Sequence, residues 1–239
     1  MRFNELMDRA LFALSVPKCI CCGERLNYGQ KAFCLKCSLE FRDFKTRNCS
    51  RCAKILSECD CSNEHMQSHF IGRVIKCYRY LPIDEKIPSN ALVFSLKRDN
   101  RNDVLEVCAN ELESAIRNSV VSPENYVITN VPRRKAAIIE YGIDHSELLA
   151  AEVAKRLGAE FIPILTSNAK KAQKSLQTTD RLKNADFEIA KSIDLKGRAV
   201  IIVDDIITSG ASMSTAASLI RSLGCKSIIA AALAIAYKD

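Results

Sequence analysis

From about position 70 onward, apolar residues occur either in short uninterrupted runs or at helical spacing. Uninterrupted runs between polar residues are typical of buried strands, and apolar residues three and four apart are typical of amphipathic helices. The runs predict strands at residues 74–80, 126–131, 161–165, 200–203 and 227–235. The helical spacing predicts helices at residues 88–96, 102–116, 144–157 and 211–223. Because strands and helices alternate, we expect an α/β fold with an open parallel sheet flanked by helices.

Individual residues mark where several of these elements begin and end. Asp144 is a good helix N-cap, and Gly158 and Gly224 are typical of the position after a helix. Residues 166–184 are polar and basic without periodicity, which predicts a mobile loop. Near the amino end, apolar residues on one helical face predict a short amphipathic helix docked on the body. These residues are Phe3, Leu6, Met7, Ala10, Leu11 and Leu14.

The 239 residues are 48% hydrophobic, 26% charged and 6% aromatic. This balance is typical of a packed globular protein and excludes a largely disordered chain. No apolar run approaches the roughly 18–20 residues that a membrane helix needs, which excludes a transmembrane class. The first residues make a poor export signal, since Glu5 and Asp8 lie where a basic leader is needed. We therefore expect a cytoplasmic, reducing compartment, with any place at the inner membrane reached through a partner protein.

Twelve cysteines stand out in the composition, and nine of them precede residue 62. Three Cys-x2-Cys pairs recur with a period of fifteen residues, and a Cys-x-Cys pair follows them. In a reducing compartment such pairs indicate metal, because a short turn directs both sulfurs at one ion at about 2.3 Å. The spacing predicts two structural Zn²⁺ sites. The expected ligands are Cys19, Cys22, Cys34 and Cys37 at the first site, and Cys49, Cys52, Cys59 and Cys61 at the second.

Several details of these sites stay open at this point. The pairs can bind metal in sequence, or interleaved with the first and third pairs together, and iron–sulfur ligation is a further alternative. Because the final Cys-x-Cys is short, His65 or His69 can replace one thiol, although two solvated histidines are the simpler interpretation. Cys21 is expected to be a bystander. Gly23 suits the sharp turn that follows Cys22.

The cysteine pattern divides the chain into two expected domains, residues 1–66 and residues 67–239. The first has few large apolar residues, so we expect its core to be thin. Structural zinc contributes about 10–16 kcal/mol of apparent binding free energy in zinc-finger peptides, which is enough to fold a segment of this size. Chelation is therefore expected to unfold residues 17–62 and to spare the rest of the chain.

The densest chemistry follows the strand at residues 200–203. Two acids come at its carboxyl end, and small hydroxyl residues and a glycine then lead into a helix. Free amides at the helix start, with a helix dipole worth roughly half a positive charge, bind phosphate. Acids do not bind phosphate but suit the vicinal hydroxyls of a sugar or a Mg²⁺ ion. The implied ligand is a ribose 5-phosphate. It would be held by Asp204, Asp205, Thr208, Ser209, Gly210, Ala211 and Ser212.

This stretch resembles the motif with which type I phosphoribosyltransferases bind 5-phosphoribosyl 1-diphosphate (PRPP). The whole chain resembles the ComF (ComFC) family of bacterial competence proteins, which join a double zinc ribbon to such a domain. The likeness extends to residues 11–23, Leu96-Lys97-x3-Arg101, residues 131–134, and Gln173-x2-Leu176 with Arg181 and Asn184. The chain departs from the family at residues 141–145, where Tyr-Gly-Ile-Asp-His replaces Arg-Gly-Phe-Asn-Gln, and at the final Cys-x-Cys.

The resemblance implies a function for these residues. The two acids would hold the ribose hydroxyls of PRPP, the following loop its 5-phosphate, and Mg²⁺ would accompany the ligand. Arg133, Arg134 and Lys135 correspond to the family's diphosphate loop. The family also implies a role in natural transformation, in which the protein handles incoming single-stranded DNA together with other competence or DNA-uptake proteins.

Basic residues gather in clusters, and the formal net charge is +7. A diphosphorylated sugar and a nucleic-acid backbone both need such charges nearby. The residues expected at a nucleic acid are Lys97, Arg101, Lys170, Lys171, Lys174 and Arg181. Aromatic stacking platforms are scarce and the chain has no Trp, so the DNA prediction depends on the resemblance more than on the residues.

Two other functions remain open from the sequence. One is an active phosphoribosyltransferase that acts on a base or an amine. Electrostatics rather than a Ser or Cys nucleophile would then stabilise the oxocarbenium-like sugar, so the sequence assigns no nucleophile. The other is a zinc-ribbon interaction module on an inactive enzyme scaffold.

Overall fold

The computed structural model describes residues 15–49, 51–55, 58–59, 61, 66, 70–81, 87–167, 187–190 and 193–236. Several predictions lie outside these ranges. They are the amino-terminal helix, the roles of His65 and His69, and the placement of Lys170, Lys171, Lys174 and Arg181. Within the described ranges, no helix combines the length and the apolarity that crossing a membrane requires.

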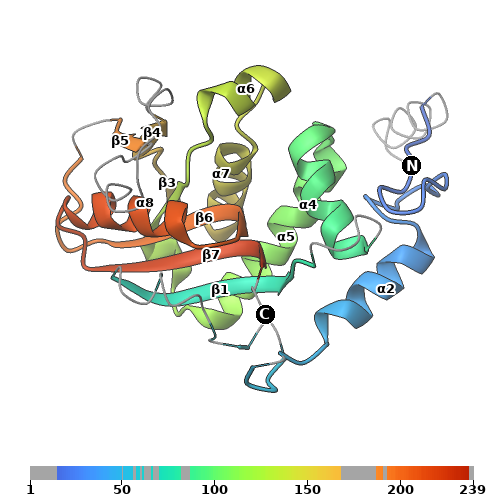
Figure 1. Cartoon of the computed structure of the whole chain (residues 1–239), viewed down its shortest axis with the longest axis horizontal. Helices are drawn as coiled ribbons and strands as arrows, with labels where there is room; N and C mark the ends of the chain where they lie inside the picture. The colour runs from blue at the N-terminus through green and yellow to red at the C-terminus, as the bar shows by residue number, and fades with distance from the viewer. Residues whose placement is uncertain are drawn as a thin grey trace, which may run out of the picture.

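A five-stranded parallel sheet forms the centre of the molecule (Figure 1). Its strands lie in the order β1-β7-β6-β2-β3, and each registered pair is parallel. The strands are β1 (Ile71–Arg79), β2 (Tyr126–Asn130), β3 (Glu160–Phe161), β6 (Ala199–Ile207) and β7 (Ser227–Ile235). The expected parallel α/β architecture is confirmed.

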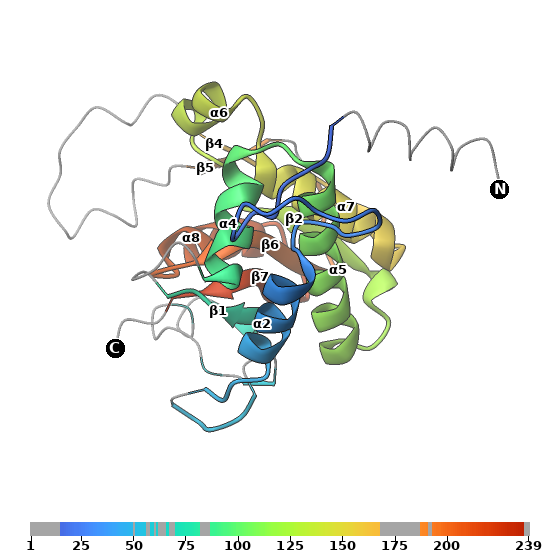
Figure 2. The same ribbon diagram turned by 90° about the vertical axis from the view of Figure 1, so that its right-hand side faces the viewer.

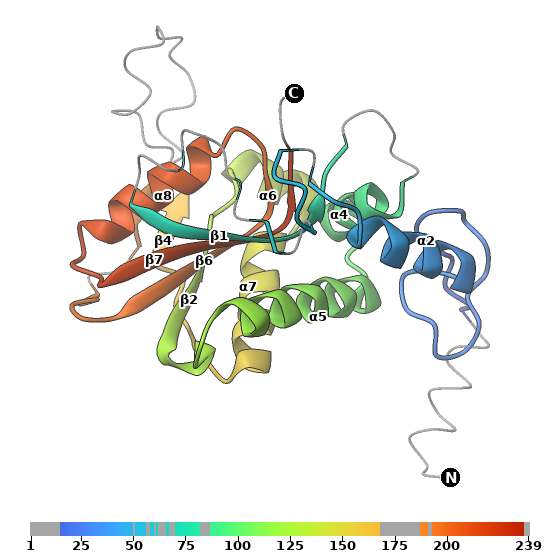
Figure 3. The same cartoon turned by 90° about the horizontal axis from the view of Figure 1, so that it is seen from below.

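Helices cover both faces of this sheet, with α5 and α7 on one side and α8 on the other (Figure 3). Alternation along β6 produces the two layers, because successive side chains of a strand point to opposite faces. Ile201 and Val203 join the core under α5 and α7, whereas Val200 and Ile202 join the core under α8. The helices are α2 (Leu35–Lys45), α4 (Pro88–Arg98), α5 (Asn102–Ser119), α6 (Lys135–Tyr141), α7 (His145–Leu157) and α8 (Ala211–Arg221).

Helix α7 has the ends that the sequence predicts. The Asp144 side chain accepts hydrogen bonds from the backbone amides of Ser146 and Glu147, which have no partner within the helix. Gly158 ends the helix in the left-handed conformation, with φ of +71°. Because these signals are local, sequence alone was sufficient to find them.

Two strand predictions need correction. The single strand expected at residues 161–165 is divided between β3 and β4 (Leu165–Ser167), and β4 pairs with β5 (Phe187–Ile189) in a separate antiparallel sheet. Strand β6 does not end at Val203 but continues to Ile207, because its pairing with β7 continues. Asp204 and Asp205 therefore lie within the last part of the strand rather than after it.

The cysteine-rich segment packs against the body of the molecule, with α2 beside α4 and α5 (Figure 2). Phe33, Phe41 and Phe44 belong to the same apolar cluster as Leu112 of α5. The few large apolar residues of this segment thus bury themselves against the main body, which supplies the core that the segment lacks.

Candidate functional site

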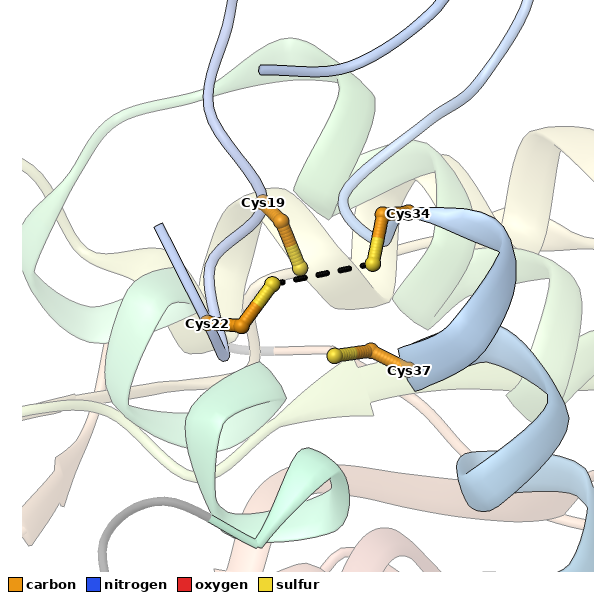
Figure 4. Close-up of side chains that lie close together, drawn as sticks. All are labelled: Cys19, Cys22, Cys34 and Cys37. Atoms are coloured by element: carbon orange, nitrogen blue, oxygen red, sulfur yellow. Dashed lines mark hydrogen bonds between the residues drawn. The ribbon is translucent and has the colours of Figure 1, made fainter. Parts of the chain in front are cut away.

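The first four-cysteine cluster lies where the segment after residue 15 meets the start of α2. The sulfurs of Cys19, Cys22, Cys34 and Cys37 point toward one another and lie within 4.8 Å of one another (Figure 4). Four sulfurs placed tetrahedrally at 2.3 Å from Zn²⁺ are about 3.8 Å apart. The Cys22 and Cys34 sulfurs are 3.6 Å apart. The geometry therefore fits a structural zinc ion.

The second cluster meets the same condition. The four sulfurs of Cys49, Cys52, Cys59 and Cys61 also lie within 4.8 Å of one another. The structure therefore groups the cysteines in sequential rather than interleaved pairs. Each group offers four thiols, which is the ligand set of a closed structural zinc site.

The two clusters begin with the same turn, repeated thirty residues later. In each turn the amide of the first cysteine, Cys19 or Cys49, donates to the carbonyl five residues on at 2.7 Å. Its carbonyl accepts from the amide four residues on, that of Gly23 or Ala53. Both of these residues have positive φ, +77° for Gly23 and +58° for Ala53. The second turn therefore places an alanine where glycine is favoured.

Backbone amides prepare one thiol of each turn for metal. Burial raises the pKa of the Cys19 thiol, but hydrogen bonds from surrounding amides outweigh burial and bring the pKa to about 7. The same balance lowers the pKa of Cys49 to about 6. Burial instead raises the pKa of Cys61 to about 12. Because the thiolate is the metal ligand, Cys19 and Cys49 are the ligands most ready to bind.

The second candidate site lies at the carboxyl edge of the sheet, around the two acids of β6. Asp205 points toward the α5 and α7 face, and its side chain is 6% exposed. Two cations hold it, with Lys97 Nζ 3.0 Å from Oδ1 and Arg133 Nη2 2.8 Å from Oδ2. Lys97 comes from the last turn of α4, and Arg133 follows β2. Three elements distant in sequence therefore meet at this carboxylate.

Asp204 points to the opposite face and is half-buried. Its Oδ1 accepts a hydrogen bond from the Asp205 amide at 2.8 Å. Burial, and next the charge of Asp205, raise the pKa of Asp204 well above its usual range. Asp204 lines a recess together with residues 206–213, which lead into α8.

The start of α8 forms the rest of this recess. Gly210 is the N-cap residue with φ of +81°, a conformation that favours glycine, and the first turn of α8 has no acidic residue. The Ala211 amide approaches Ser209 Oγ at 3.4 Å. The first amides of a helix lack intrahelical partners and attract anions. An acid and the start of a helix thus share one recess.

The other predicted site residues are placed as follows. Arg134 is exposed at the N-cap position of α6, and Lys135 is the first residue of that helix. Arg101 does not approach the acids. Its guanidinium binds Asp103 at 2.7 Å and donates to the carbonyl of Lys18 at 2.7 Å, which joins the cysteine-rich segment to α5.

His145 and the recess beside it were not predicted from the sequence. His145 is buried, and its Nε2 lies 2.7 Å from Asn100 Oδ1. Burial, and next the charge of Arg133, lower its pKa. A recess between the α4–α5 corner and α7 is lined by Leu96, Asn100, Arg101, Asn102, Leu105, Ile143, His145 and Leu148. The departure at residues 141–145 was the available signal, since two of the lining residues fall there.

Residues 144–238 match the family model described as "Phosphoribosyl transferase domain". This match includes the strand with the two acids, the turn at residues 208–210 and α8. The fold and the site thus define a phosphoribosyltransferase-like domain joined to two four-cysteine clusters that fit a double zinc ribbon. The chain is also similar to Competence protein F of Haemophilus influenzae, with 25% identity over 226 residues, covering 88% of this chain and 93% of that protein. The chain is therefore a homologue of Competence protein F, and the expected ComF resemblance is confirmed.

Two further similarities cover less of the chain. A stretch of 41 residues is 51% identical to Ribose-phosphate pyrophosphokinase 2 of Archaeoglobus fulgidus, and covers 17% of this chain and 15% of that enzyme. The crystal structure of adenine phosphoribosyltransferase from Thermoanaerobacter pseudethanolicus is similar with 22% identity and a TM-score of 0.37. This match covers 56% of the present chain and 81% of the chain of that enzyme.

Proposed function

We propose that the chain binds PRPP with Mg²⁺ at the carboxyl edge of β6. The observation that carries this proposal is the recess that Asp204 shares with the anion-binding turn before α8. The 5-phosphate binds the amides and hydroxyls of residues 208–212, and the ribose hydroxyls bind the carboxylates of Asp204 and Asp205. Arg133, Arg134 and Lys135 bind the diphosphate, whose oxygens also coordinate Mg²⁺.

Ligand binding at this edge requires a local exchange of partners. In the structure, Arg133 and Lys97 both hold Asp205. A diphosphate offers these cations a more highly charged partner and draws Arg133 away from the acid. The released carboxylate oxygen then accepts a hydrogen bond from a ribose hydroxyl. The cations therefore keep a buried acid compensated until the sugar arrives.

Titration calorimetry with PRPP and Mg²⁺ tests the site. The wild-type chain is expected to bind one PRPP, and Asp204→Asn is expected to bind at least tenfold more weakly. Glu124→Gln is a matched control, because Glu124 is exposed and precedes β2 at the opposite edge of the sheet. Equal affinity of Asp204→Asn and the wild type would remove the site assignment.

We infer further that this homologue of Competence protein F acts in the cytoplasm during natural transformation, where it handles incoming single-stranded DNA with other competence or DNA-uptake proteins. Similarity to Competence protein F over 88% of the chain supports this role. Lys97, Arg101, Lys170, Lys171, Lys174 and Arg181 are the proposed DNA contacts. Binding of a fluorescent oligonucleotide should weaken steeply with salt. Binding that is absent, or independent of salt, would contradict the inference.

A second candidate is an active phosphoribosyltransferase, and the recess beside His145 favours it. This recess is lined by apolar side chains from three helices, α4, α5 and α7, and Asn100 also lines it. Its lining residue Leu96 directly precedes Lys97, which is bound to Asp205. A planar base or an amine that fills the recess is the proposed acceptor. Diphosphate release from PRPP with a panel of bases and amines tests this activity. Leu148→Trp is expected to abolish turnover by filling the recess while PRPP still binds.

A further inference from the structure

Lys76 is a buried cation in the central part of β1. Its relative exposure is 1%. Lysine is rarely buried this completely, because an ammonium without a compensating charge costs several kcal/mol in a protein interior. Among the described residues, Lys31, Lys45 and Lys97 pair with carboxylates, whereas Lys76 makes no ion pair within 4.0 Å. Its charge therefore requires another source of compensation.

The contacts of Lys76 lead to the second cysteine cluster. Its Nζ donates to the backbone carbonyl of Cys61 at 2.8 Å and to that of Cys59. Both carbonyls belong to residues whose sulfurs are in the second cluster. Cys61 also packs against the apolar core on the α8 face of the sheet. The ammonium thus contacts the backbone of two of the four residues whose thiols form the second cluster.

We propose that Lys76 is the counter-charge of the second metal site. Four thiolates and one Zn²⁺ carry a net charge of −2, since −4 and +2 sum to −2. An ammonium bound to the carbonyls of two ligand residues both compensates this charge and fixes the short chain between them. Groups behind metal ligands orient the ligands and tune metal affinity in this way. Lys76 is therefore a positioning residue of the metal site, although it belongs to the sheet.

The register of the sheet connects Lys76 with Asp204 of β6. β1 is the edge strand of the sheet, beside β7. Ala232 of β7 is in register with Lys76 on one side and with Asp204 on the other. Registered residues of parallel strands point to the same face. Loss of metal from the second cluster leaves a buried, uncompensated charge in the same row as Asp204, and it destabilises β1 as well as the cysteine-rich segment.

The first cluster has no equivalent contact among the described residues. It is joined to α5 by partly exposed groups, such as Lys45 with Glu111 at 2.7 Å and Arg101 with the carbonyl of Lys18. Lys45 in α2 is therefore a matched control, because it is a lysine of the cysteine-rich segment that already pairs with a carboxylate. The two sites should respond differently to loss of a nearby lysine.

Zinc stoichiometry and affinity, measured by competition with a chromogenic chelator, provide the first test. The wild type is expected to bind two Zn²⁺. Lys76→Met should weaken the binding of one of the two ions by 10–100-fold, which is the usual effect of removing a group that orients a metal ligand. Lys76→Arg, which keeps the charge, should weaken this binding less, and Lys45→Met should leave the affinity for both ions unchanged. The proposal would be overturned if Lys76→Met left both affinities unchanged or weakened both equally.

A second test uses the sign of the stability change and does not depend on PRPP binding. In the wild type, Lys76→Met should lower the melting temperature, because it removes the counter-charge of a bound metal. In a Cys59→Ser/Cys61→Ser chain, which lacks this metal, the same substitution should raise the melting temperature, because it removes an uncompensated charge. A purely structural role predicts the same direction in both chains, and that result would refute the proposal.

Discussion

The neighbouring acids of β6 are expected to affect stability in opposite directions. Burial and the charge of Asp205 raise the pKa of Asp204 in the folded chain. A raised pKa contributes stability that is present below the unfolded pKa of about 3.9 and is lost as pH rises through the folded value. At pH 7 this carboxyl group therefore disfavours the folded chain. The desolvation penalty of a buried polar group is about 1–3 kcal/mol, so Asp204→Asn should raise the free energy of unfolding by about this amount.

Asp205→Asn should have the opposite effect, because Asp205 compensates two cations. Lys97 lies 3.0 Å and Arg133 2.8 Å from its oxygens, and its side chain is 6% exposed. Removing one partner of a buried ion pair costs about 3–5 kcal/mol, since the other charge is left uncompensated. Lys97 is 28% exposed and can turn toward water, so we expect the lower end of this range, a loss of about 3 kcal/mol.

Urea unfolding of both variants between pH 4 and pH 8, followed by far-UV circular dichroism, measures the two effects. The gain in Asp204→Asn should shrink as pH falls and be small near pH 4, where the wild-type acid is protonated in the folded chain and about half protonated in the unfolded chain. The asparagine oxygen still accepts from the Asp205 amide, so that hydrogen bond is retained. If both variants shift stability in the same direction at pH 7, the reasoning is refuted.

Three further predictions follow from single residues. Ala53→Gly should stabilise the second turn by about 1 kcal/mol, because φ of +58° is strained for alanine. Gly23→Ala should destabilise the first turn for the same reason. Unfolding as a function of chelator concentration measures both effects. Asp144→Ala should lower the free energy of unfolding in urea by about 1 kcal/mol through loss of the α7 cap. The lowered pKa of His145 means that stability falls as pH decreases below about 6.5, since the unfolded state then binds the proton. His145→Gln should flatten the melting temperature between pH 7 and pH 5, and an unchanged slope would exclude this explanation.

Local signals explain which parts of the fold the sequence could predict. Asp144 and Gly158 act within their own helix, and the last strand, β7, is an apolar run whose observed bounds equal the predicted ones. The end of β6 could not be predicted in this way. Pairing with β7 continues the strand past Val203 although two acids follow, and pairing between distant strands leaves no local pattern.

The sequence predicts the kinds of site but not the contacts between their residues. The cysteine spacing and the acid–turn–helix pattern both lie in nearly consecutive residues, so a site could be predicted from each. Lys97 and Arg101 appeared equivalent in sequence, as basic residues near a helix end. In the structure the first binds Asp205 and the second binds Asp103 and the cysteine-rich segment. The burial of Lys76 likewise depends on contacts with a segment that a linear pattern does not reveal.

The proposed PRPP site is the recess between Asp204 and the start of α8. A crystal structure of the chain with PRPP and Mg²⁺ shows directly whether a sugar phosphate binds there. We expect the 5-phosphate on the amides of residues 209–212, the ribose hydroxyls at Asp204 and Asp205, and Arg133 turned from Asp205 to the diphosphate. A crystal with saturating ligand that leaves this recess empty, or that binds PRPP elsewhere, would contradict the claim.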